Sequence, residues 1–416
     1  MAVDAASDQL RGVWTNEYYP VGLFADSVQG KLYCLSEWPA LVSVIDPFAN
    51  KVLGSIPLPG CPQAMAFNNV DRKAYVAVGW SEETEDAVVV IDAVGDTVLT
   101  EIAVARTPNF MVYDADDDLL YVADSSSDRV LAIDGRTDRV VDSCRVYDYP
   151  IGLLYNGARR RLYSVGKRGE VAAITPRVHG QNNYITVDGG LECFALDARG
   201  ATLFGGNTSL ESLFVIDCVG ESLAGMIGVP LPPVALCYDS QHDQLYSVYG
   251  EEHSGMSAID CPGRFVRAIV EVDAQRLYWD PGADAVYCIT DSSVTVVDGR
   301  TRRVAATLDV VWPAGVASAP GWPRVYVAQY DDSYLRIVRT DEWPQVPAAP
   351  DAQATVVGGK IDWTGTQAVM YDKCGRRVAD VHRGENDVSR LQPGVYFVRQ
   401  NGVPRGTYAR KVVITR

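Results

Sequence analysis

An aromatic residue within a short apolar segment recurs along most of the chain at nearly constant spacing. Successive occurrences are 39 to 46 residues apart, and most steps are 41 or 42 residues. A period of this length, built from short strands, indicates the blades of a β-propeller. We therefore predict an all-β propeller with eight four-stranded blades, or seven because the unit at 264–311 is irregular. The eight aromatic residues are Tyr33, Tyr75, Tyr121, Tyr163, Phe204, Tyr246, Tyr287 and Tyr326.

Two eighteen-residue segments show the parts of the repeat. Residues 19–36 read YPVGLFADSVQGKLYCLS, and residues 149–166 read YPIGLLYNGARRRLYSVG. In each, a proline opens an apolar strand, an Asp or Asn begins a turn, and the aromatic strand follows. Asp and Asn favour such turns because their side chains accept hydrogen bonds from the backbone two residues on. No segment keeps a 3.6-residue apolar period, so we expect almost no helix.

The ends of the repeat region suggest how the ring closes. The last unit, at about 313–340, has three strand-like segments and lacks a fourth, whereas residues 11–19 form one strand-like segment without a blade. An open ring would expose sheet edges. We therefore predict that residues 1–19 close the last blade and that residues 20–340 form the propeller.

A second unit follows the propeller. Residues 341–353 are rich in Pro and Ala, which is typical of a linker between domains. Residues 354–416 again read as strands and turns but lack the blade repeat. We predict a small separate domain there, and a β-sandwich used only as a spacer is one interpretation of it.

Both units resemble known families. The segments KAYVA (73–77), LLYVADSSSDRVLAIDGRTDRVV (119–141) and RVYVAQYDDSYLRIV (324–338) are similar to YVTN-type β-propeller repeats. That resemblance covers about 20–340 and implies the fold, because such propellers have unrelated functions. Residues 371–378, 387–399 and 411–413 resemble the C-terminal sorting domain of proteins exported by the type IX (Por) secretion system. This resemblance implies an immunoglobulin-like sandwich, the type IX machinery as a partner and a secreted or cell-surface protein. It also implies a leader peptide, which the polar first residues do not provide.

The charge of the chain argues against a nucleic acid partner, and its apolar pattern argues against a membrane-spanning helix. The net charge is −16 and the pI is about 4.7. A nucleic-acid-binding protein needs a basic face for the phosphates, and the sequence shows none. No apolar run approaches the roughly 20 residues of a membrane-spanning helix. We therefore predict no nucleic acid partner and no transmembrane segment.

Cysteines and acidic turns give little sign of a metal. The nine cysteines include no CxxC pair, and several lie in apolar strand patterns, where a free Cys behaves as a small hydrophobe. An odd number leaves at least one without an intrachain partner. The acidic turn at 114–118, DADDD, offers oxygen ligands for Ca²⁺ but lacks the glycine and distal glutamate of a calcium loop. We predict no cofactor, with a Ca²⁺ ion as the alternative.

Catalytic motifs are absent from the sequence. It contains no GxSxG elbow, no HExxH helix motif and no GxxxxGK[ST] phosphate loop. The four histidines are isolated from one another and from the cysteines. We therefore assign no catalytic residues, and we favour a protein that is not an enzyme.

The propeller geometry indicates where a ligand would bind. The first strand of each blade lines the central channel, and the loops at one end of these strands converge on a concave surface. The residue directly after the opening proline, or in the equivalent place, is polar in four units. The residue that follows it is small or apolar in the other units and an arginine in the seventh. Arg276 and Glu192 are the first pair to test, and the alternative is that they join neighbouring blades as an ion pair. The predicted channel-mouth residues are Gln63, Asn109, Glu192, Gln275, Arg276, Trp38, Trp80, Tyr149 and Trp312.

Three functional hypotheses follow from these patterns. The first is a secreted or cell-surface scaffold that binds a small molecule, a glycan or a protein at the channel mouth. The second is a lactonase-like hydrolase or lyase with a metal-assisted site, in which Glu192, Asn109 and His253 would supply the carboxylate, amide and imidazole. The third is a structural surface protein or filament protein. We favour the first, because no nucleophile, base or metal cluster is visible.

Overall fold

The computed structural model describes most of the chain between residues 11 and 415. The described residues are 11–14, 18–79, 86–104, 107–146, 149–176, 182–249, 255–318, 324–330, 334–339, 354–357, 360–363, 368–371, 377–382, 384–388, 390–391, 394–400 and 410–415. Within them the regular elements are β-strands, apart from one 3-10 turn at Ser125–Ser127.

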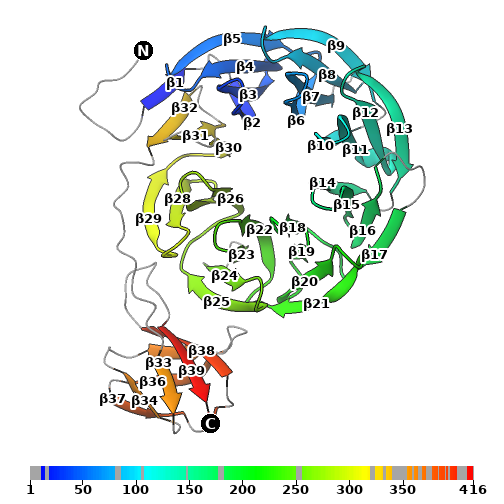
Figure 1. Cartoon of the computed structure of the whole chain (residues 1–416). Helices are drawn as coiled ribbons and strands as arrows, with labels where there is room; N and C mark the ends of the chain where they lie inside the picture. Colours follow the sequence, from blue (N-terminus) through cyan, green and yellow to red (C-terminus); the bar gives the residue numbers. More distant parts are fainter. Residues whose placement is uncertain are drawn as a thin grey trace.

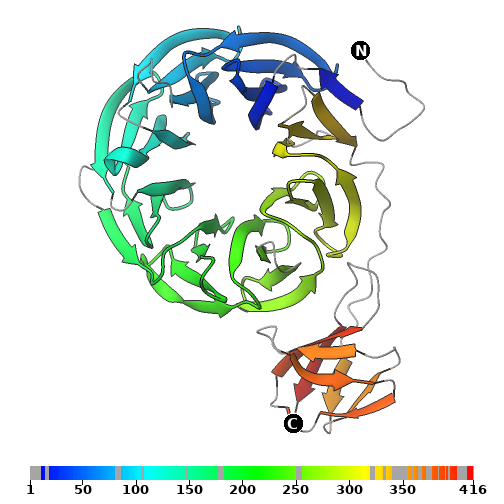
Figure 2. The same ribbon diagram turned by 180° about the vertical axis from the view of Figure 1, so that it is seen from behind.

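Eight four-stranded antiparallel sheets are arranged in a ring around a central channel (Figures 1 and 2). We number them as blades 1 to 8 in chain order of their first strand, which we call the inner strand. The chain is therefore an all-β propeller with four-stranded blades. The inner strands surround the channel, and the fourth strands, such as β5, β9 and β13, form the outer rim.

The strand bounds of the first four blades follow the repeat of the sequence. Blade 1 has β2 (Tyr18–Asp26), β3 (Lys31–Trp38), β4 (Leu41–Asp46) and β5 (Lys51–Pro57). Blade 2 has β6 (Cys61–Asn68), β7 (Lys73–Gly79), β8 (Ala87–Asp92) and β9 (Thr97–Ala103). Blade 3 has β10 (Pro108–Asp114), β11 (Leu119–Asp124), β12 (Arg129–Asp134) and β13 (Arg139–Arg145). Blade 4 has β14 (Pro150–Asn156), β15 (Arg161–Gly166), β16 (Glu170–Ile174) and β17 (Asn182–Thr186).

The remaining blades complete the ring. Blade 5 has β18 (Cys193–Leu196), β19 (Thr202–Gly206), β20 (Ser212–Asp217) and β21 (Ser222–Gly228). Blade 6 has β22 (Pro233–Asp239), β23 (Gln244–Tyr249), β24 (Met256–Asp260) and β25 (Phe265–Val270). Blade 7 has β26 (Arg276–Asp280), β27 (Ala285–Ile289), β28 (Ser293–Asp298) and β29 (Val304–Asp309). Blade 8 has β30 (Pro313–Ala317), β31 (Arg324–Gln329), β32 (Tyr334–Arg339) and β1 (Arg11–Trp14).

Blade 8 combines strands from the two ends of the propeller. Strand β1 pairs antiparallel with β32, in a register that runs from Arg11 opposite Ile337 to Trp14 opposite Tyr334. Tyr18 and Tyr19, which we predicted as part of this closing segment, belong instead to β2 of blade 1. The closing strand is therefore shorter than the predicted segment.

The repeated aromatic residues fill the spaces between blades. Tyr33, Tyr75, Tyr163 and Tyr246 are completely buried in the second strand of their blades. Each hydroxyl donates to a backbone carbonyl in a turn of the next blade; for Tyr246 the acceptor is Gly299, at 3.1 Å. This shared contact explains why the aromatic residue recurs. Its ring fills the space between two blades, and its hydroxyl forms a hydrogen bond with the next blade.

The same contact joins the last blade to the first, and it leads to a testable prediction. The Tyr326 hydroxyl donates to the Pro47 carbonyl at 2.6 Å, whereas the corresponding Tyr163 bond to Cys218 is 3.4 Å long. We expect Tyr326→Phe to lower the free energy of unfolding by about 1–2 kcal/mol, because it leaves a buried carbonyl without this donor. Tyr163→Phe should cost less. Urea unfolding followed by circular dichroism measures the free energy of unfolding of both variants. Equal losses in the two variants would contradict the expectation that the shorter Tyr326–Pro47 bond contributes more than the Tyr163–Cys218 bond.

Asp or Asn residues shape the turns at the far end of the inner strands. The Oδ1 atom of Asp26 accepts the backbone N–H groups of Val28 and Gln29, both at 2.9 Å. Asn68 does the same in blade 2, and Asp239 does so in blade 6. The predicted turn residues therefore act as the local sequence suggested, by satisfying the backbone of a tight turn.

The start of the inner strands contains a feature that the sequence did not reveal. In six blades the strand register shifts at the residue directly after the opening proline, which is the irregularity of a β-bulge. The inner strands β18 and β26 have neither the proline nor the shift. Because a bulge redirects the side chain of the extra residue, the position after the proline differs in geometry between the two groups.

The C-terminal residues form sheets of their own. Five strands pair in the order β33 (Ala354–Val357), β39 (Arg410–Thr415), β38 (Gly394–Gln400), β35 (Ala368–Tyr371) and β36 (Arg377–Val381). A second sheet pairs β34 (Lys360–Trp363) with β37 (Gly384–Asp387). Strands β33 and β39 run parallel, and the other pairs are antiparallel. The predicted immunoglobulin-like classification stays a prediction.

Two further sequence predictions concern cysteines and membranes. Eight of the nine cysteines lie in the described residues; no disulfide joins any of them to another, and five of them are buried. Burial raises the pKa of Cys144 and Cys218 to about 11, which fits packing roles and not reactive ones. Among the described residues, none of the helical structure has the length and apolar character to span a membrane.

Candidate functional site

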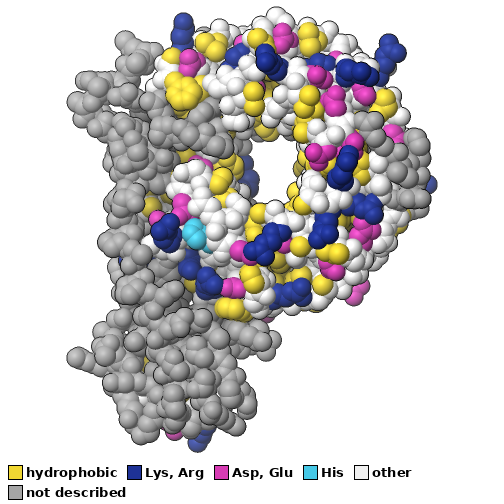
Figure 3. Space-filling model, viewed as in Figure 1, with side chains coloured by type: hydrophobic (Ala, Val, Ile, Leu, Met, Phe, Trp, Pro, Cys, Tyr) yellow, Lys and Arg dark blue, Asp and Glu magenta, His cyan; other side chains and the backbone are white. Residues whose placement is uncertain are grey.

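The channel is open through the centre of the ring, as the space-filling view shows (Figure 3). We call the end where the inner strands begin the channel mouth. The loops between second and third strands also lie there, because the antiparallel order brings the end of each second strand beside the start of its inner strand. The predicted site residues therefore belong to this end of the channel.

Four residues that directly precede an opening proline have left-handed backbone conformations. Their φ values are 63° at Tyr19, 61° at Thr107, 51° at Tyr149 and 50° at Trp312. A bulky residue rarely adopts this conformation, so surrounding contacts must enforce it. Because the strained conformation recurs at the same position of four blades, it belongs to the repeated architecture of the mouth.

Hydrogen bonds from neighbouring loops hold these strained residues. The Trp312 N–H donates to the Asp291 carbonyl of blade 7 at 2.6 Å, and the Trp312 carbonyl accepts from Tyr330 N–H at 2.8 Å. The Tyr149 N–H similarly donates to Oδ1 of Asp128 at 2.9 Å. With the backbone fixed in this way, the rings remain in contact with solvent: Trp312 is 55%, Tyr149 44% and Tyr19 40% exposed.

The aromatic residues of blades 8 and 1 form one connected group with polar residues of blade 7. The rings of Tyr19 and Tyr330 have centroids 5.0 Å apart and are tilted by 52°. Gln275 donates through Nε2 to Oδ2 of Asp291 at 3.3 Å, and Asp291 in turn holds the backbone of Trp312. We call this group the mouth arc; its members are Tyr19, Gln275, Arg276, Asp291, Trp312 and Tyr330.

Arg276 joins blade 7 to blade 8 and does not pair with Glu192. Its guanidinium donates to the Ala314 carbonyl at 3.0 Å and also to the Pro313 carbonyl. Burial lowers the pKa of Arg276 from its usual value, and the nearby Asp291 carboxylate opposes that shift. Glu192 accepts the Thr208 N–H within blade 5 at 3.2 Å. The alternative of an ion pair between these two residues is therefore wrong, because blade 6 separates the blades that carry them. Their joint role in a ligand site stays a prediction.

The other predicted residues are distributed around the mouth. Trp38 is 71% exposed at the end of β3. Gln63 donates to the Cys61 carbonyl of its own strand at 3.4 Å. Asn109 has a buried Oδ1 atom for which no hydrogen-bond donor is present among the described residues. Trp80 lies outside the described residues, so its predicted role stays a prediction.

The residues proposed for a lactonase-like site are not seen together. Glu192 and Asn109 belong to blades 5 and 3, and the described residues show no hydrogen bond between them. His253 lies outside the described residues. The enzymatic alternative therefore stays a prediction without a geometric argument in its favour.

The acidic turn at 114–118 uses its carboxylates within the protein. Oδ1 of Asp118 accepts the Tyr113 hydroxyl at 2.8 Å and the Asn68 amide at 3.1 Å. Asp117 forms an ion pair with Arg160 at 2.6 Å, and Asp114 accepts two backbone N–H groups of its own turn. No group of three or more potential metal ligands was found in the described part of the chain.

Comparison with known proteins supports the fold. No protein-family model matches the sequence. A curated relative, described as the seven-bladed beta-propeller protein Rv1057 of Mycobacterium tuberculosis (strain ATCC 25618 / H37Rv), is 24% identical over 370 residues, which cover 85% of this chain and 89% of the relative. That description gives seven blades for the relative, whereas strand pairing in this chain gives eight four-stranded sheets. Because the pairing is a property of this chain and the identity is low, we describe this chain by its eight sheets.

Solved structures show the same architecture at lower sequence identity. The computationally designed Ika8 protein has a TM-score of 0.62 and 11% identity, over 78% of this chain and 96% of the designed one. The hydrazine synthase of Kuenenia stuttgartiensis has a TM-score of 0.53 and 17% identity, over 70% of this chain and 97% of its own. A chain of the mitotic checkpoint complex has a TM-score of 0.52 and 15% identity, over 67% of this chain and 86% of its own. These similarities concern the fold alone.

Proposed function

We propose that this protein is a non-catalytic binding propeller whose ligand is held at the mouth arc. One observation carries the proposal: bulky aromatic residues at equivalent positions are held in strained left-handed conformations with their rings exposed. Strain of this kind is retained where surrounding structure enforces it, and it concentrates at ligand sites. The departure of blade 7 from the repeat adds Gln275 and Arg276 at the same place.

A carbohydrate fits the chemistry of the mouth arc. Exposed Trp and Tyr faces stack on the apolar face of a sugar ring, while amide and carboxylate groups accept or donate hydrogen bonds to its hydroxyls. Trp312 and Tyr19 supply the faces, and Gln275 and Asp291 supply the polar groups beside them. The charges of Asp291 and Arg276 offset each other, so a neutral saccharide is favoured over a charged one.

The test uses Trp312→Ala against a panel of neutral oligosaccharides made from glucose, mannose, galactose and N-acetylglucosamine. We expect one member to bind the full chain in calorimetric titration and the variant to bind it about tenfold more weakly. Removing one stacked ring loses about 0.5–1.5 kcal/mol in addition to the apolar area that it buries, and about 1.4 kcal/mol corresponds to a tenfold change in affinity. Phe48→Ala is the matched control, since Phe48 is a 60% exposed aromatic residue in the turn between β4 and β5. Binding that Trp312→Ala leaves unchanged would place the ligand elsewhere.

We also propose that the C-terminal unit directs export, on the basis of the motifs at 371–378, 387–399 and 411–413. From the segments at 73–77, 119–141 and 324–338, we propose that the propeller repeats are of the YVTN type. An export signal at the C-terminus would place the protein at the cell surface or outside the cell. Fusing residues 354–416 and a secretory leader to a fluorescent protein tests the export proposal in a bacterium with a type IX system. Fluorescence retained in the periplasm, equal to that of a fusion without residues 354–416, would oppose it.

A further inference from the structure

The most exposed aromatic side chains of the described residues gather on one part of the channel mouth. Their exposure lies between 38% and 71%, and within this described set only Phe48 belongs to the opposite end of the channel. The described residues of blades 5, 6 and 7 contribute none of them. Apolar residues that are exposed singly are ordinary, whereas a gathering of them marks a binding surface. The gathered residues are Trp312 at blade 8, Tyr19 and Trp38 in blade 1, Phe110 in blade 3 and Tyr149 at blade 4.

The left-handed residues of the mouth fall into two pairs on the same part of the ring. Trp312 and Tyr19 precede the prolines of the neighbouring blades 8 and 1. Thr107 and Tyr149 precede those of blades 3 and 4. The inner strands β30 and β2 lie on one side of the channel, and β10 and β14 lie on the other (Figure 1). Blade 2 separates the two pairs, and it has the proline without a left-handed residue before it.

The second pair is held in the same way as the first. The Tyr149 N–H donates to Oδ1 of Asp128 at 2.9 Å, and the Tyr149 carbonyl accepts the Lys167 N–H at 3.3 Å. The Thr107 N–H donates to Oδ2 of Asp86 at 2.6 Å. Both carboxylates lie between the second and third strands of the preceding blade, which is also where the backbone acceptor of the mouth arc lies. Neighbouring blades therefore fix both pairs by equivalent contacts.

The second pair also offers the chemistry of the mouth arc. The Tyr149 ring is 44% exposed and the Phe110 ring 38%. On the same loops, the hydroxyl oxygens of Thr107 and Ser126 are 2.6 Å apart at the surface, and Asp128 supplies a carboxylate. Ring faces beside hydroxyl and carboxylate groups match the apolar face and the hydroxyls of a sugar. We call this group the second arc; its members are Thr107, Phe110, Ser126, Asp128 and Tyr149.

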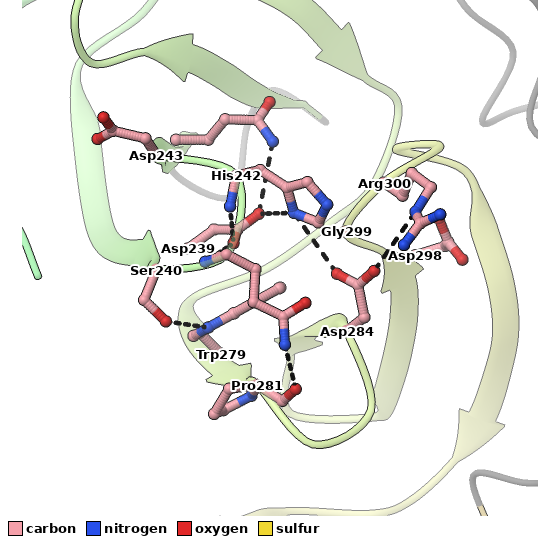
Figure 4. Close-up of polar contacts among 12 residues, drawn as sticks. Asp239, Ser240, His242, Asp243, Trp279, Pro281, Asp284, Asp298, Gly299 and Arg300 are labelled. Carbon is pink, nitrogen blue, oxygen red and sulfur yellow. Dashed lines mark hydrogen bonds and ion pairs between the residues drawn. The ribbon is translucent and has the colours of Figure 1, made fainter.

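The opposite end of the channel shows how aromatic and charged side chains lie where they serve the fold (Figure 4). Between blades 6 and 7, Nδ1 of His242 is 2.8 Å from Oδ2 of Asp239 and 3.5 Å from Oδ1 of Asp284. The Trp279 indole donates to Oγ of Ser240 at 3.4 Å, and its ring packs against the buried core that blades 6 and 7 share. These side chains contact one another, whereas the rings of the two arcs face solvent.

We propose that the second arc is a second saccharide subsite and that the mouth binds a linear neutral polysaccharide along the rim of blades 8, 1, 2, 3 and 4. This inference rests on the function proposed for the mouth arc. Between the two arcs lie Trp38, 71% exposed at the end of β3, and the Gln63 amide of blade 2. A short sugar cannot contact both arcs, because a whole blade separates them, whereas an extended chain can. The Asp128 carboxylate disfavours an acidic polysaccharide.

Two subsites on one rim make the affinity depend on the length of the sugar chain. A chain that occupies the mouth arc holds its following sugars near the second arc at a high effective concentration, so the two contacts reinforce each other. A disaccharide that occupies one arc gains nothing from the other. The dependence on chain length therefore separates this inference from the proposed function, which requires the mouth arc alone.

The test is calorimetric titration of the full chain with the disaccharide and with a long soluble linear chain of each sugar in the panel above. We expect the long chain of one sugar to bind about 100-fold more tightly than its disaccharide. Tyr149→Gly should weaken long-chain binding about tenfold and leave disaccharide binding at the mouth arc unchanged, because one of two linked contacts is lost. Its unfolding temperature should change little, since glycine adopts the left-handed conformation without strain, which offsets the lost ring contacts.

Phe110→Ala is the second variant, and it decides if Tyr149→Gly fails to fold. Blade 2 has an alanine, Ala64, at the corresponding place after its proline, so the architecture accepts this residue type. Phe110→Ala should show the same selective loss of long-chain binding. Phe48→Ala is the matched control, and it should bind both chain lengths like the wild type.

The outcomes separate the two proposals. Equal binding of both chain lengths by the wild type would overturn the second arc and leave the mouth arc intact. A length dependence that persists unchanged in Tyr149→Gly and in Phe110→Ala would do the same. If no sugar of the panel binds at either length, both proposals are wrong.

Discussion

Removing residues 1–14 is expected to lower the free energy of unfolding of the propeller by about 3–5 kcal/mol, since four residues of paired strand are lost and the edge of β32 becomes exposed. Strand β1 supplies the outer strand of blade 8 through the pairs from Arg11–Ile337 to Trp14–Tyr334. No other strand of the described chain pairs with that edge of β32. The ring would therefore remain closed only through its inner strands and side chains.

A shorter deletion provides the control. Removing residues 1–10 leaves β1 intact, so its unfolding midpoint in urea should match that of the full chain when both are followed by far-ultraviolet circular dichroism. The longer deletion should unfold at a clearly lower urea concentration and should form higher oligomers on a sizing column, because an exposed strand edge pairs with other chains. Identical midpoints for the two deletions would show that β1 does not stabilise the ring.

Gly152→Ala is expected to destabilise the propeller by about 2–3 kcal/mol, because it overpacks the interface between blades 4 and 5. A Cβ atom at Gly152 would lie 2.6 Å from Cε1 of Phe194 and closer still to its Cζ atom. The Phe194 ring packs with buried residues of blade 4, including Tyr163 and Val165. It cannot withdraw without giving up these contacts.

Gly54→Ala is the matched control, since no atom lies within 4 Å of the position that its Cβ would take. This change should leave the unfolding midpoint nearly unchanged or raise it slightly, because alanine has less freedom than glycine in the unfolded chain. Replacing Phe194 by Ala in the Gly152→Ala background should recover part of the loss relative to the two separate changes. Strictly additive losses would show that Gly152 and Phe194 do not oppose each other.

The sequence predicted the parts of the fold that depend on residue type at a fixed spacing. Tyr33 and Tyr246 recur because every blade interface needs one large side chain, and Asp26 and Asn68 recur because every inner strand ends in the same turn. Each requirement is met within one repeat, so a single sequence shows it. The Ca²⁺ alternative and the sorting-like classification of the C-terminal unit stay predictions.

The mouth arc was predicted only in part, for physical reasons. Trp312 and Gln275 were candidates because of their positions, but the left-handed backbone at Trp312 depends on a hydrogen bond from another blade. The alternative of an Arg276–Glu192 ion pair was wrong because side-chain length and blade order decide which groups meet, and the repeat pattern contains neither.

The bond from the Tyr326 hydroxyl to the Pro47 carbonyl joins residues that are 279 positions apart in the chain. During synthesis on the ribosome, blade 1 therefore emerges long before the side chain that covers this carbonyl. The strand β1 must likewise wait, unpaired, for β32. Contacts of such large sequence separation form late, because the intervening chain must be ordered first. A nascent chain that stalls before residue 326 would consequently present both an uncovered blade face and a free strand, which are the features that chaperones and proteases recognise.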